Sequence, residues 1–454
     1  MPTADPGSFR DPASHIVFDG DRVLRLLDER GLRGWSALSK SDFFARATGD
    51  GRLIESTAAE YPDADAEGAL QHPLIPFISY PHEWTFSMLK DAALLQLDLL
   101  AEALVEGLTI KDATPYNIQF VDGRPVFMDI GSFEEYSPGE PWIGYQQFTR
   151  QFLFPLMLRS YLGVPFQPWL RGNPEGPTAA DMRRLLGFWQ RLKPSTLMHV
   201  SLQARMERRM SGTAVRGQMK TAGFSAELIL ANVRRLRKVV AGLEWSGGGE
   251  GWIEYESCRH VGRDRDTKTQ FLDQVLTRHR PGRVIDLGAN DGHFSARAAA
   301  TGALAIAVDG DEPVLDALYR RRTGVSVALT DLTNPSPSQG WAGRERPGLV
   351  DRARPDLVIA YGLIHHLIYT ASIPPAAVVE WLASFACPVI VEFVAPDDEM
   401  VARLTANKIE AELHEGRSQS EFEKLLAAHF DTVATSGLGE GTRVLYSLNP
   451  AVIG

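Results

Sequence analysis

The second half of the chain alternates short apolar runs with segments of helical periodicity. The apolar runs cover residues 283–287, 304–308, 325–329, 356–360 and 388–393. Such alternation is typical of βαβ units, which build a parallel sheet covered by helices. Two later runs, 430–435 and 443–447, are joined by Ser-Gly-Leu-Gly-Glu-Gly, which predicts an antiparallel hairpin. We therefore expect an α/β domain with a seven-stranded, doubly wound sheet that ends in an antiparallel pair.

The first half has less regular patterning. An apolar helix is predicted over 85–105, and two short strands, 118–121 and 126–128, meet at an Asp-Gly-Arg-Pro turn. The aromatic residues between Trp142 and Tyr161 are predicted to pack in a core. Between Ile229 and Leu243, apolar residues recur every three or four positions. This spacing predicts an amphipathic helix that packs on its own domain, with Ser225 as its N-cap.

A domain boundary is indicated by Ser-Gly-Gly-Gly-Glu-Gly at 246–251, because consecutive glycines have the highest backbone entropy. The total of 454 residues is enough for two or three domains. We expect one domain over 1–245, a linker and lid segment over 246–264, and a second domain over 265–454.

The composition, net charge and cysteine count exclude some classes of protein. Hydrophobic residues make up 44% and charged residues 23%, which is ordinary for a globular protein. The net charge of −10 gives no general attraction to nucleic acid or to an anionic membrane, although a local basic patch can still exist. Cys258 and Cys387 cannot form a disulfide framework or a multi-cysteine zinc site, and they suit a reducing compartment.

No signal-peptide core and no apolar run long enough to span a membrane is apparent in the sequence. These features predict a cytoplasmic protein with no nucleic-acid or membrane partner. The oligomeric state is left open.

The most informative string is Arg-Val-Ile-Asp-Leu-Gly-Ala-Asn-Asp-Gly-His-Phe-Ser at 283–295. An apolar strand ends near Asp286, and a loop with Gly288 and Gly292 leads into a helix at about His293. Glycines here let a ligand lie against the backbone at the carboxyl end of the first strand. Because the spacing is G-x-x-x-G rather than G-x-G-x-x-G, the loop is poorly suited to a pyrophosphate.

Acidic residues follow the next two strands. Asp309 ends the second strand, 21 residues after Gly288 (309 − 288), and a carboxylate there can accept hydrogen bonds from both hydroxyls of a ribose. Asp311 is an alternative for this role. Asp331 follows the third strand, where it can accept from an adenine amino group while Leu332 packs against the ring. Each acid taken alone is equally consistent with a loop cap.

Together these strings resemble the class I S-adenosylmethionine-dependent methyltransferases, over about 252–449. The resemblance implies a Rossmann-like fold and S-adenosylmethionine as cofactor, with no metal in this domain. Asp286 and Gly288 would border the methionine end, Asp309 the ribose, and Asp331 with Leu332 the adenine. Asn290 and Gly292, in the same loop, are also expected to bind the cofactor. The strings Pro-Ser-Pro at 335–337, Glu-Arg at 345–346 and Ile-Val-Glu-Phe-Val at 390–394 look like a bacterial subgroup related to the nodulation-protein methyltransferases.

Methyl transfer requires alignment of the reacting atoms and, for some acceptors, removal of a proton. His365 and His366 follow the fourth strand, at the edge of the expected crevice, and neutral histidine is a suitable base near pH 7. Tyr255 and Lys268, which precede the first strand, are weaker candidates. Glu392 ends the fifth strand, where it either faces the substrate or is buried with a hydrogen-bonded partner. We expect a small-molecule acceptor, whose identity the sequence leaves open.

The N-terminal half contains a second polar motif. Asp112 and Asn117 are five residues apart, and Asp129 follows a hairpin, 12 residues after Asn117. This string resembles the catalytic and metal-binding loops of protein-kinase-like and aminoglycoside-phosphotransferase-like enzymes. The resemblance implies an α+β domain with a site for ATP and Mg²⁺. No glycine-rich phosphate loop or strand lysine is apparent before the motif, so we expect a kinase-like domain without phosphotransfer activity. Such a domain would be either a nucleotide-binding remnant or a structural or substrate-recruiting domain.

The sequence is compatible with three functions. The first is methyl transfer from S-adenosylmethionine to a small molecule. The second is an ATP-dependent small-molecule phosphotransferase with an accessory methyltransferase-like domain. The third is a regulatory protein that binds the cofactor without catalysis.

Overall fold

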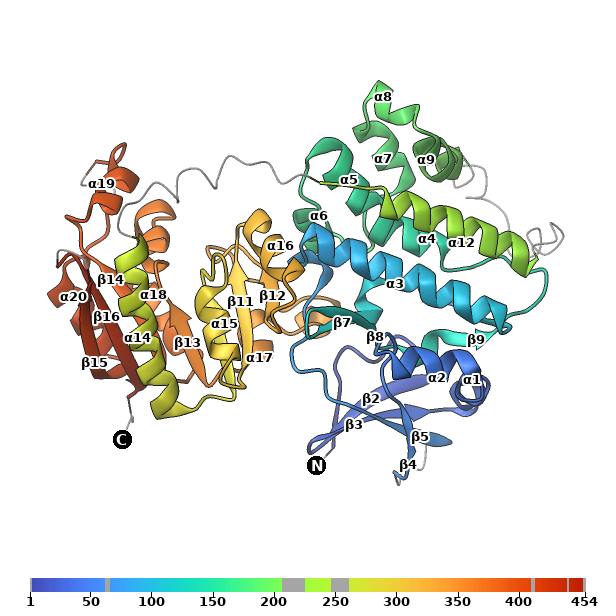
Figure 1. Ribbon diagram of the computed structural model, residues 1–454, viewed down its shortest axis with the longest axis horizontal. Coiled ribbons are helices and arrows are strands. Elements are labelled where there is room, and N and C mark those ends of the chain that lie inside the picture. The colour runs from blue at the N-terminus through green and yellow to red at the C-terminus, as the bar shows by residue number, and fades with distance from the viewer. Residues whose placement is uncertain are drawn as a thin grey trace. The chain divides into compact units, whose positions relative to one another are not determined.

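The computed structural model describes residues 2–61, 66–205, 225–245, 261–409, 413–438 and 441–451. The chain forms two compact units (Figure 1). The first is Met1–Ser246 with Arg344–Arg346, and the second is Gly247–Gly343 with Pro347–Gly454. Most of the expected linker and lid segment lies outside the described residues, as do Tyr255 and Cys258.

The first unit begins with a five-stranded antiparallel sheet. Its strands, in the spatial order β1-β2-β3-β5-β4, are β1 (Thr3–Ala4), β2 (Ser14–Asp19), β3 (Arg22–Leu27), β5 (Gly68–His72) and β4 (Thr57–Ala59). Two helices lie between β3 and β4 in the chain, α1 (Glu29–Ser39) and α2 (Asp42–Gly49). Their N-caps, Asp28 and Ser41, each accept a hydrogen bond from a backbone N–H three residues later, which fixes where the helices begin.

The predicted helix and hairpin of the first half are confirmed. The helix is α3 (Phe86–Val105), which packs against α12 (Ala226–Ala241), whose N-cap is Ser225 as expected. The hairpin joins β7 (Ile118–Val121) to β8 (Arg124–Phe127). Its turn is two residues long, shorter than expected, because both Asp122 and Gly123 adopt positive φ. A second short pair joins β6 (Leu108–Ile110) to β9 (Phe133–Glu135).

Short helices complete the first unit: α4 (Tyr145–Phe148), α5 (Phe154–Leu162), α6 (Gln167–Gly172), α7 (Ala179–Leu185), α8 (Phe188–Arg191) and α9 (Pro194–Thr196). Trp142 and the phenylalanines from Phe148 to Phe154 are buried, as predicted, whereas Tyr145 and Tyr161 are only partly buried. Among the described residues of both units, no helix has the length and hydropathy needed to cross a bilayer.

The second unit contains the predicted seven-stranded sheet. In spatial order its strands are β12 (Ser326–Leu329), β11 (Leu304–Asp309), β10 (Arg283–Leu287), β13 (Leu357–Ala360), β14 (Val389–Val394), β16 (Arg443–Pro450) and β15 (Phe430–Leu438). The first five are parallel, and β16 is antiparallel to both of its neighbours. The strand order reverses between β10 and β13, which is where open α/β sheets bind ligands.

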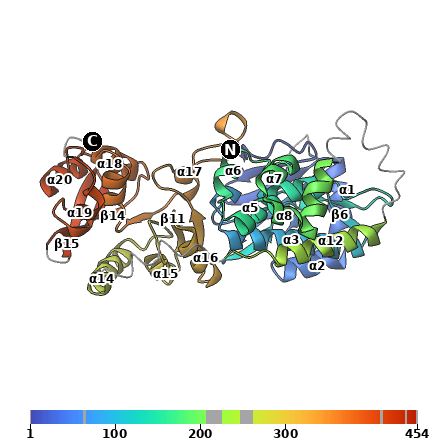
Figure 2. The same cartoon turned by 90° about the horizontal axis from the view of Figure 1, so that it is seen from above.

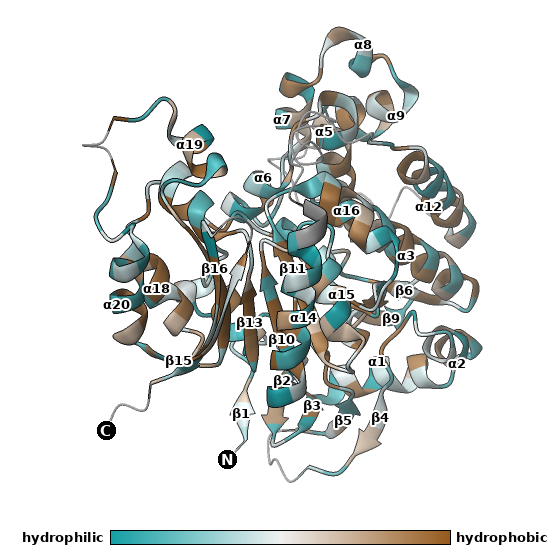
Figure 3. Cartoon of the chain, turned by 60° about the vertical axis from the view of Figure 1, so that its left-hand side comes forward, coloured by the Kyte–Doolittle hydropathy of each residue, from teal (hydrophilic) through white to brown (hydrophobic). Residues whose placement is uncertain are grey.

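The helices of this unit are α14 (Val261–His279), α15 (His293–Ala299), α16 (Glu312–Arg320), α17 (Leu349–Ala353), α18 (Pro375–Ala383), α19 (Glu399–Thr405) and α20 (Gln419–Ala427). Figure 2 shows α14, α15 and α16 along one face of the sheet, and α17 and α18 on the other. Because both faces are covered, β13 is buried and apolar throughout (Figure 3).

Candidate functional site

The loop after β10 has a backbone shape that depends on glycine. Gly288, Asn290 and Gly292 have φ of 76°, 47° and 74°. A Cβ added at Gly292 would lie 2.5 Å from Cδ2 of Leu318, so a larger residue would both strain the backbone and collide with the helix behind it. The loop therefore keeps a tight turn at the carboxyl end of the first parallel strand.

Asp286 is buried at the end of β10. Its Oδ2 accepts a hydrogen bond of 2.6 Å from the Ser295 hydroxyl, which ties the strand to α15. Burial raises the pKa of Asp286 to about 7, because the charged carboxylate is deprived of water. The residue predicted to border the methionine end thus also holds the helix that follows the loop.

Asp309 ends β11 beside the same loop. Its Oδ2 accepts from the backbone N–H of Asn290 at 2.8 Å, and its Oδ1 accepts from the N–H of Asp311 at 2.9 Å. Each carboxylate oxygen keeps a further lone pair for a ligand hydroxyl. Asp311, the alternative ribose ligand, instead accepts from Val314 N–H as the N-cap of α16.

The residues after β12 form the third part of this edge. Asp331 is exposed, and its Oδ1 accepts from the backbone N–H and the hydroxyl of Thr333, at 2.8 and 2.7 Å. Leu332 is buried. Thr330 is also buried, and its Oγ1 has no hydrogen-bond partner among the described residues. The edge therefore offers one exposed carboxylate, one apolar side chain and one unsatisfied hydroxyl close together in the chain.

His365 and His366 follow β13 at the start of a short π-helical turn, His366–Thr370. Their ring centroids are 4.3 Å apart. His365 is only 3% exposed and its Nδ1 has no partner among the described residues, whereas His366 is half-buried. Burial lowers the pKa of both imidazoles, and at His366 the charge of Asp309 partly opposes this effect. Both rings are therefore neutral near pH 7 and able to accept a proton.

Glu392, at the same edge of the sheet, is fully buried. Its carboxylate accepts from Lys268 Nζ at 2.6 Å, from Gly362 N–H at 2.7 Å and from Arg443 Nη1 at 3.3 Å. Of the two expectations for this residue, burial with hydrogen-bonded partners is the correct one. Lys268, a weaker catalytic candidate, is one of these partners, and it comes from α14.

The sequence did not lead us to Arg443 or to its ion-pair partner Asp398 as site residues. The guanidinium of Arg443 makes two hydrogen bonds with the carboxylate of Asp398, at 2.8 and 3.0 Å, besides its contact with Glu392. Arg443 opens β16, which pairs with β14, so the antiparallel pairing brings these charges together. The signal that could have identified Arg443 is its place at the first position of a predicted strand that is otherwise mostly apolar.

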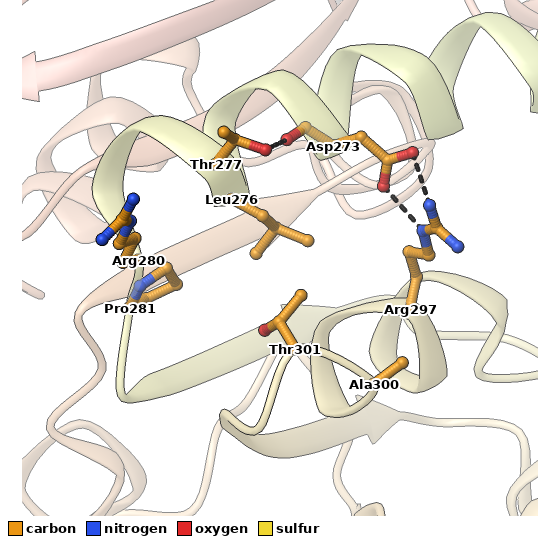
Figure 4. A pocket seen from close by; sticks show the side chains of 8 residues that line it. All are labelled: Asp273, Leu276, Thr277, Arg280, Pro281, Arg297, Ala300 and Thr301. Atoms are coloured by element: carbon orange, nitrogen blue, oxygen red, sulfur yellow. Dashed lines mark hydrogen bonds and ion pairs between the residues drawn. The ribbon is translucent and has the colours of Figure 1, made fainter.

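A hollow of about 610 Å³ lies elsewhere in this unit (Figure 4). Arg280 and Pro281, which line it, precede β10, and Ala300 and Thr301 precede β11. The hollow thus lies at the amino ends of these strands, opposite the edge described above. It is bordered by the ion pair between Asp273 and Arg297, whose closest N–O distance is 2.6 Å, and it includes none of the predicted site residues.

The polar motif of the first unit forms a linked network. Asn117 Nδ2 donates to the Ser132 hydroxyl at 3.1 Å, and this hydroxyl donates to Asp129 Oδ2 at 2.5 Å. Arg25 Nη1 donates to Asp129 Oδ1 at 2.8 Å. Burial tends to raise the pKa of Asp129, but the charge of Arg25 and the Ser132 hydrogen bond outweigh it and hold that pKa below its usual value. The pKa of Asp112 is raised, first by burial and then by the charge of Asp129.

These residues do not fit a magnesium ion. The cationic, nearly buried Arg25 lies 2.8 Å from Asp129 Oδ1, and its charge would repel a metal ion at this carboxylate. No group of three or more His, Cys, Asp or Glu side chains suited to a metal occurs in the part of the chain that the structure describes. Sequence reasoning missed Arg25, although an arginine flanked by leucines in a buried strand was a visible signal.

The chain is similar to known proteins in sequence and, over part of its length, in structure. No protein-family model matches it. It is 36% identical over 416 residues to the nodulation protein NoeA of Rhizobium meliloti (strain 1021), covering 88% of this chain and 87% of that protein.

Two solved structures are similar to part of the chain. The magnesium protoporphyrin IX methyltransferase ChlM of Synechocystis PCC 6803, with bound SAH, is 19% identical, covers 42% of this chain and 88% of its own, and has a TM-score of 0.29. The N-methyltransferase NodS of Bradyrhizobium japonicum WM9 is 11% identical and has a TM-score of 0.30. The match covers 42% of this chain and 98% of NodS. On the extent and identity of its match to NoeA, the chain belongs to the family of this nodulation protein.

Proposed function

We propose that the protein transfers a methyl group from S-adenosylmethionine to a small-molecule acceptor. The observation that carries the proposal is the order of polar groups along one sheet edge. Asp286 lies near the carboxyl end of β10 and the 288–292 loop follows it, Asp309 ends β11, and Asp331 follows β12. These three are neighbouring parallel strands. Their carboxyl ends therefore meet at one edge, next to the reversal of strand order.

The residues at this edge suit the parts of the cofactor. The remaining lone pairs of Asp309 would accept the ribose hydroxyls, and Asp331 with Leu332 would frame the adenine. The backbone of Gly288, where an added Cβ would touch Leu363 Cβ at 3.5 Å, would border the methionine end. When bound, the cofactor supplies a methyl group already activated on a sulfonium. The protein must then orient the acceptor and exclude water.

Proton removal is assigned to His366. Its imidazole is neutral near pH 7 and half-buried, so it can take a proton from an acceptor hydroxyl or amine that approaches the edge. The more deeply buried His365 lies against it and is assigned a positioning role. The Lys268–Glu392–Arg443 cluster would hold α14 and β16 against the strand ends.

For the first unit we propose a kinase-like domain that does not transfer phosphate. Support comes from the order of its elements: an antiparallel sheet with helices inserted after its third strand, a long helix, and a hairpin between Asn117 and Asp129. The hydrogen bond from Arg25 to Asp129 argues against metal-assisted phosphotransfer. The alternative of an ATP-dependent phosphotransferase has no supporting observation.

The experiment uses S-adenosylmethionine carrying an isotopically labelled methyl group. The full-length protein is incubated with the labelled cofactor and a bacterial small-molecule extract, and labelled products are found by mass spectrometry. We expect labelled product with wild type and with the control Asp431→Ala, an exposed acid on β15, but not with Asp309→Ala. Asp112→Ala should stay within a few-fold of wild type.

Two results would contradict this assignment. One is the absence of any labelled product with wild-type protein that binds the cofactor, which would favour a regulatory role. The other is acceptor-dependent ADP formation that disappears in Asp112→Ala, which would favour the phosphotransferase.

A further inference from the structure

The charges of the chain are unevenly distributed. The whole chain has a net charge of −10, yet residues 182–205 inclusive contain five Lys or Arg residues and no Asp or Glu. This stretch covers the end of α7, then α8 and α9. The net charge alone predicts repulsion from an anionic surface, whereas this stretch would be attracted to one.

Large apolar side chains are exposed in the same stretch. Phe188 and Trp189 on α8 are 68% and 77% exposed, and their rings touch edge to face with centroids 5.3 Å apart. About half of the surface of three nearby leucines is also exposed: Leu185, Leu192 and Leu197. We call these five residues, with Arg184, Arg191 and Lys193, the α8 patch. Figures 1 and 3 show α8 at the outer end of the first unit, beyond α7 and α9.

Each cation of the α8 patch contacts a neighbouring group of the first unit. Arg191 Nε donates to the Leu186 carbonyl at 2.7 Å, and Lys193 Nζ lies 3.8 Å from the centre of the Tyr161 ring. Arg184 is 3.7 Å from Asp181, whose carboxylate also accepts hydrogen bonds from Thr178 at the N-cap of α7. Several large exposed apolar side chains gathered in one stretch are a feature of interaction sites.

We propose that the α8 patch docks on the surface of an anionic lipid bilayer. Trp and Phe insert favourably at the level of lipid headgroups, and Lys and Arg beside them are attracted to anionic phosphates. The two groups of residues here occupy one short stretch, so they can meet the membrane together. The attachment is peripheral, since no described helix is able to span the bilayer.

Charge argues against another segment of the chain as the occupant. Residues 206–224, whose structure is not described, contain four Lys or Arg residues and one acid, Glu207. A segment of that composition repels a basic surface rather than complementing it. A second copy of the protein is the remaining competitor, and the experiment separates it from the membrane.

The test is co-sedimentation of the full-length protein with vesicles. One set is pure phosphatidylcholine, and the other contains phosphatidylcholine and anionic phosphatidylglycerol. We expect binding to the anionic set only, weakening as salt is added. Phe188→Ser with Trp189→Ser should reduce binding at least about tenfold, through lost apolar burial. Arg184→Gln and Arg191→Gln should each reduce it about fivefold. Matched controls are Trp341→Ser, a 73% exposed tryptophan, and Arg403→Gln, an exposed arginine on α19.

The variants are first compared with wild type by thermal unfolding, so that a folding defect is recognised. Wild-type protein that fails to bind anionic vesicles would overturn the proposal. So would equal loss of binding in the Trp341→Ser control. Dimerisation of wild type in the absence of vesicles, abolished in the Phe188/Trp189 double variant, would instead assign the patch to a self-interface. Since vesicle binding requires neither cofactor nor acceptor, these outcomes are independent of the proposed methyl transfer.

Discussion

The backbone N–H of Asn290 donates a 2.8 Å hydrogen bond to the carboxylate of Asp309. This contact joins the loop after the first parallel strand to the end of the second. Asn290 has φ of 47°, a left-handed conformation that asparagine tolerates better than most residues, and its N–H is presented by the turn between Gly288 and Gly292. The shape of the loop and the orientation of the proposed ribose ligand therefore depend on each other.

The first prediction concerns Gly292→Ala. Its new Cβ would meet Leu318 at 2.5 Å and would also force alanine into positive φ. The control is Gly302→Ala, where φ is 91° but no atom lies within 4 Å. We expect Gly302→Ala to lower the free energy of unfolding by about 1–2 kcal/mol, the cost of the backbone strain alone, and Gly292→Ala to lower it by about 1–3 kcal/mol more. Urea unfolding of both variants measures these losses. Equal losses would show that the loop can move away from Leu318.

The second prediction concerns the two histidines. His366→Ala should lower turnover by about 10²–10⁴-fold with unchanged cofactor affinity, because its imidazole accepts the proton. Since burial lowers the pKa of His366 below 6.5, the wild-type rate should rise with pH along a limb centred below 6.5 and then stay level. The exposed His15 provides the control variant His15→Ala. Near wild-type turnover in His366→Ala would show that proton removal occurs elsewhere or is not needed.

The third prediction concerns Asp286 and pH. The pKa of its carboxyl is about 7 in the folded chain, against an ordinary value of 3.8. The folded state therefore holds this proton more tightly, so the contribution of Asp286 to stability falls as pH rises from about 4 to about 7. Asp286→Asn has no such proton and can still accept from Ser295. Relative to wild type, the variant should gain a few kcal/mol of unfolding free energy across this range, as measured by urea unfolding. A constant difference between the two proteins would contradict the raised pKa.

The fourth prediction concerns Arg25. Arg25→Gln removes the cation that faces the carboxylate of Asp129 and leaves that charge without its partner. We expect a loss of about 1–3 kcal/mol of unfolding free energy, because the pair is only partly open to water. Arg33→Gln, which breaks an exposed pair with Glu29, should cost almost nothing. If both variants have the same stability, the Asp129 network does not hold this unit together.

The parallel sheet was predictable because its signals are local. The strand over 283–287 was predicted with the bounds that the structure shows, since an apolar run is followed at once by a glycine-containing loop. The later hairpin was predicted too short, because β15 continues to Leu438 and takes up residues that the sequence suggested were a turn. Gly437 is compatible with a turn and also with an extended edge strand, so the residue type alone did not predict where β15 ends.

Contacts between distant segments were not predictable in the same way. Arg25 meets Asp129 across 104 positions of the chain, and Arg443 meets Glu392 across 51. Such pairs depend on how strands are ordered in a sheet, and one sequence contains no direct signal of that order. Asp309 and Asp331 were found because acids at strand ends are recognisable by position, but their hydrogen bonds to the backbone were not.

The most direct test of the central claim is calorimetric titration of S-adenosylhomocysteine into the full-length protein. Wild type and Asp431→Ala should bind alike. Asp309→Ala should bind more weakly by about 2–4 kcal/mol, because charge-assisted hydrogen bonds to two ribose hydroxyls are lost. Unchanged affinity in a folded Asp309→Ala variant, or no binding by wild type, would contradict the assignment of this sheet edge as the cofactor site.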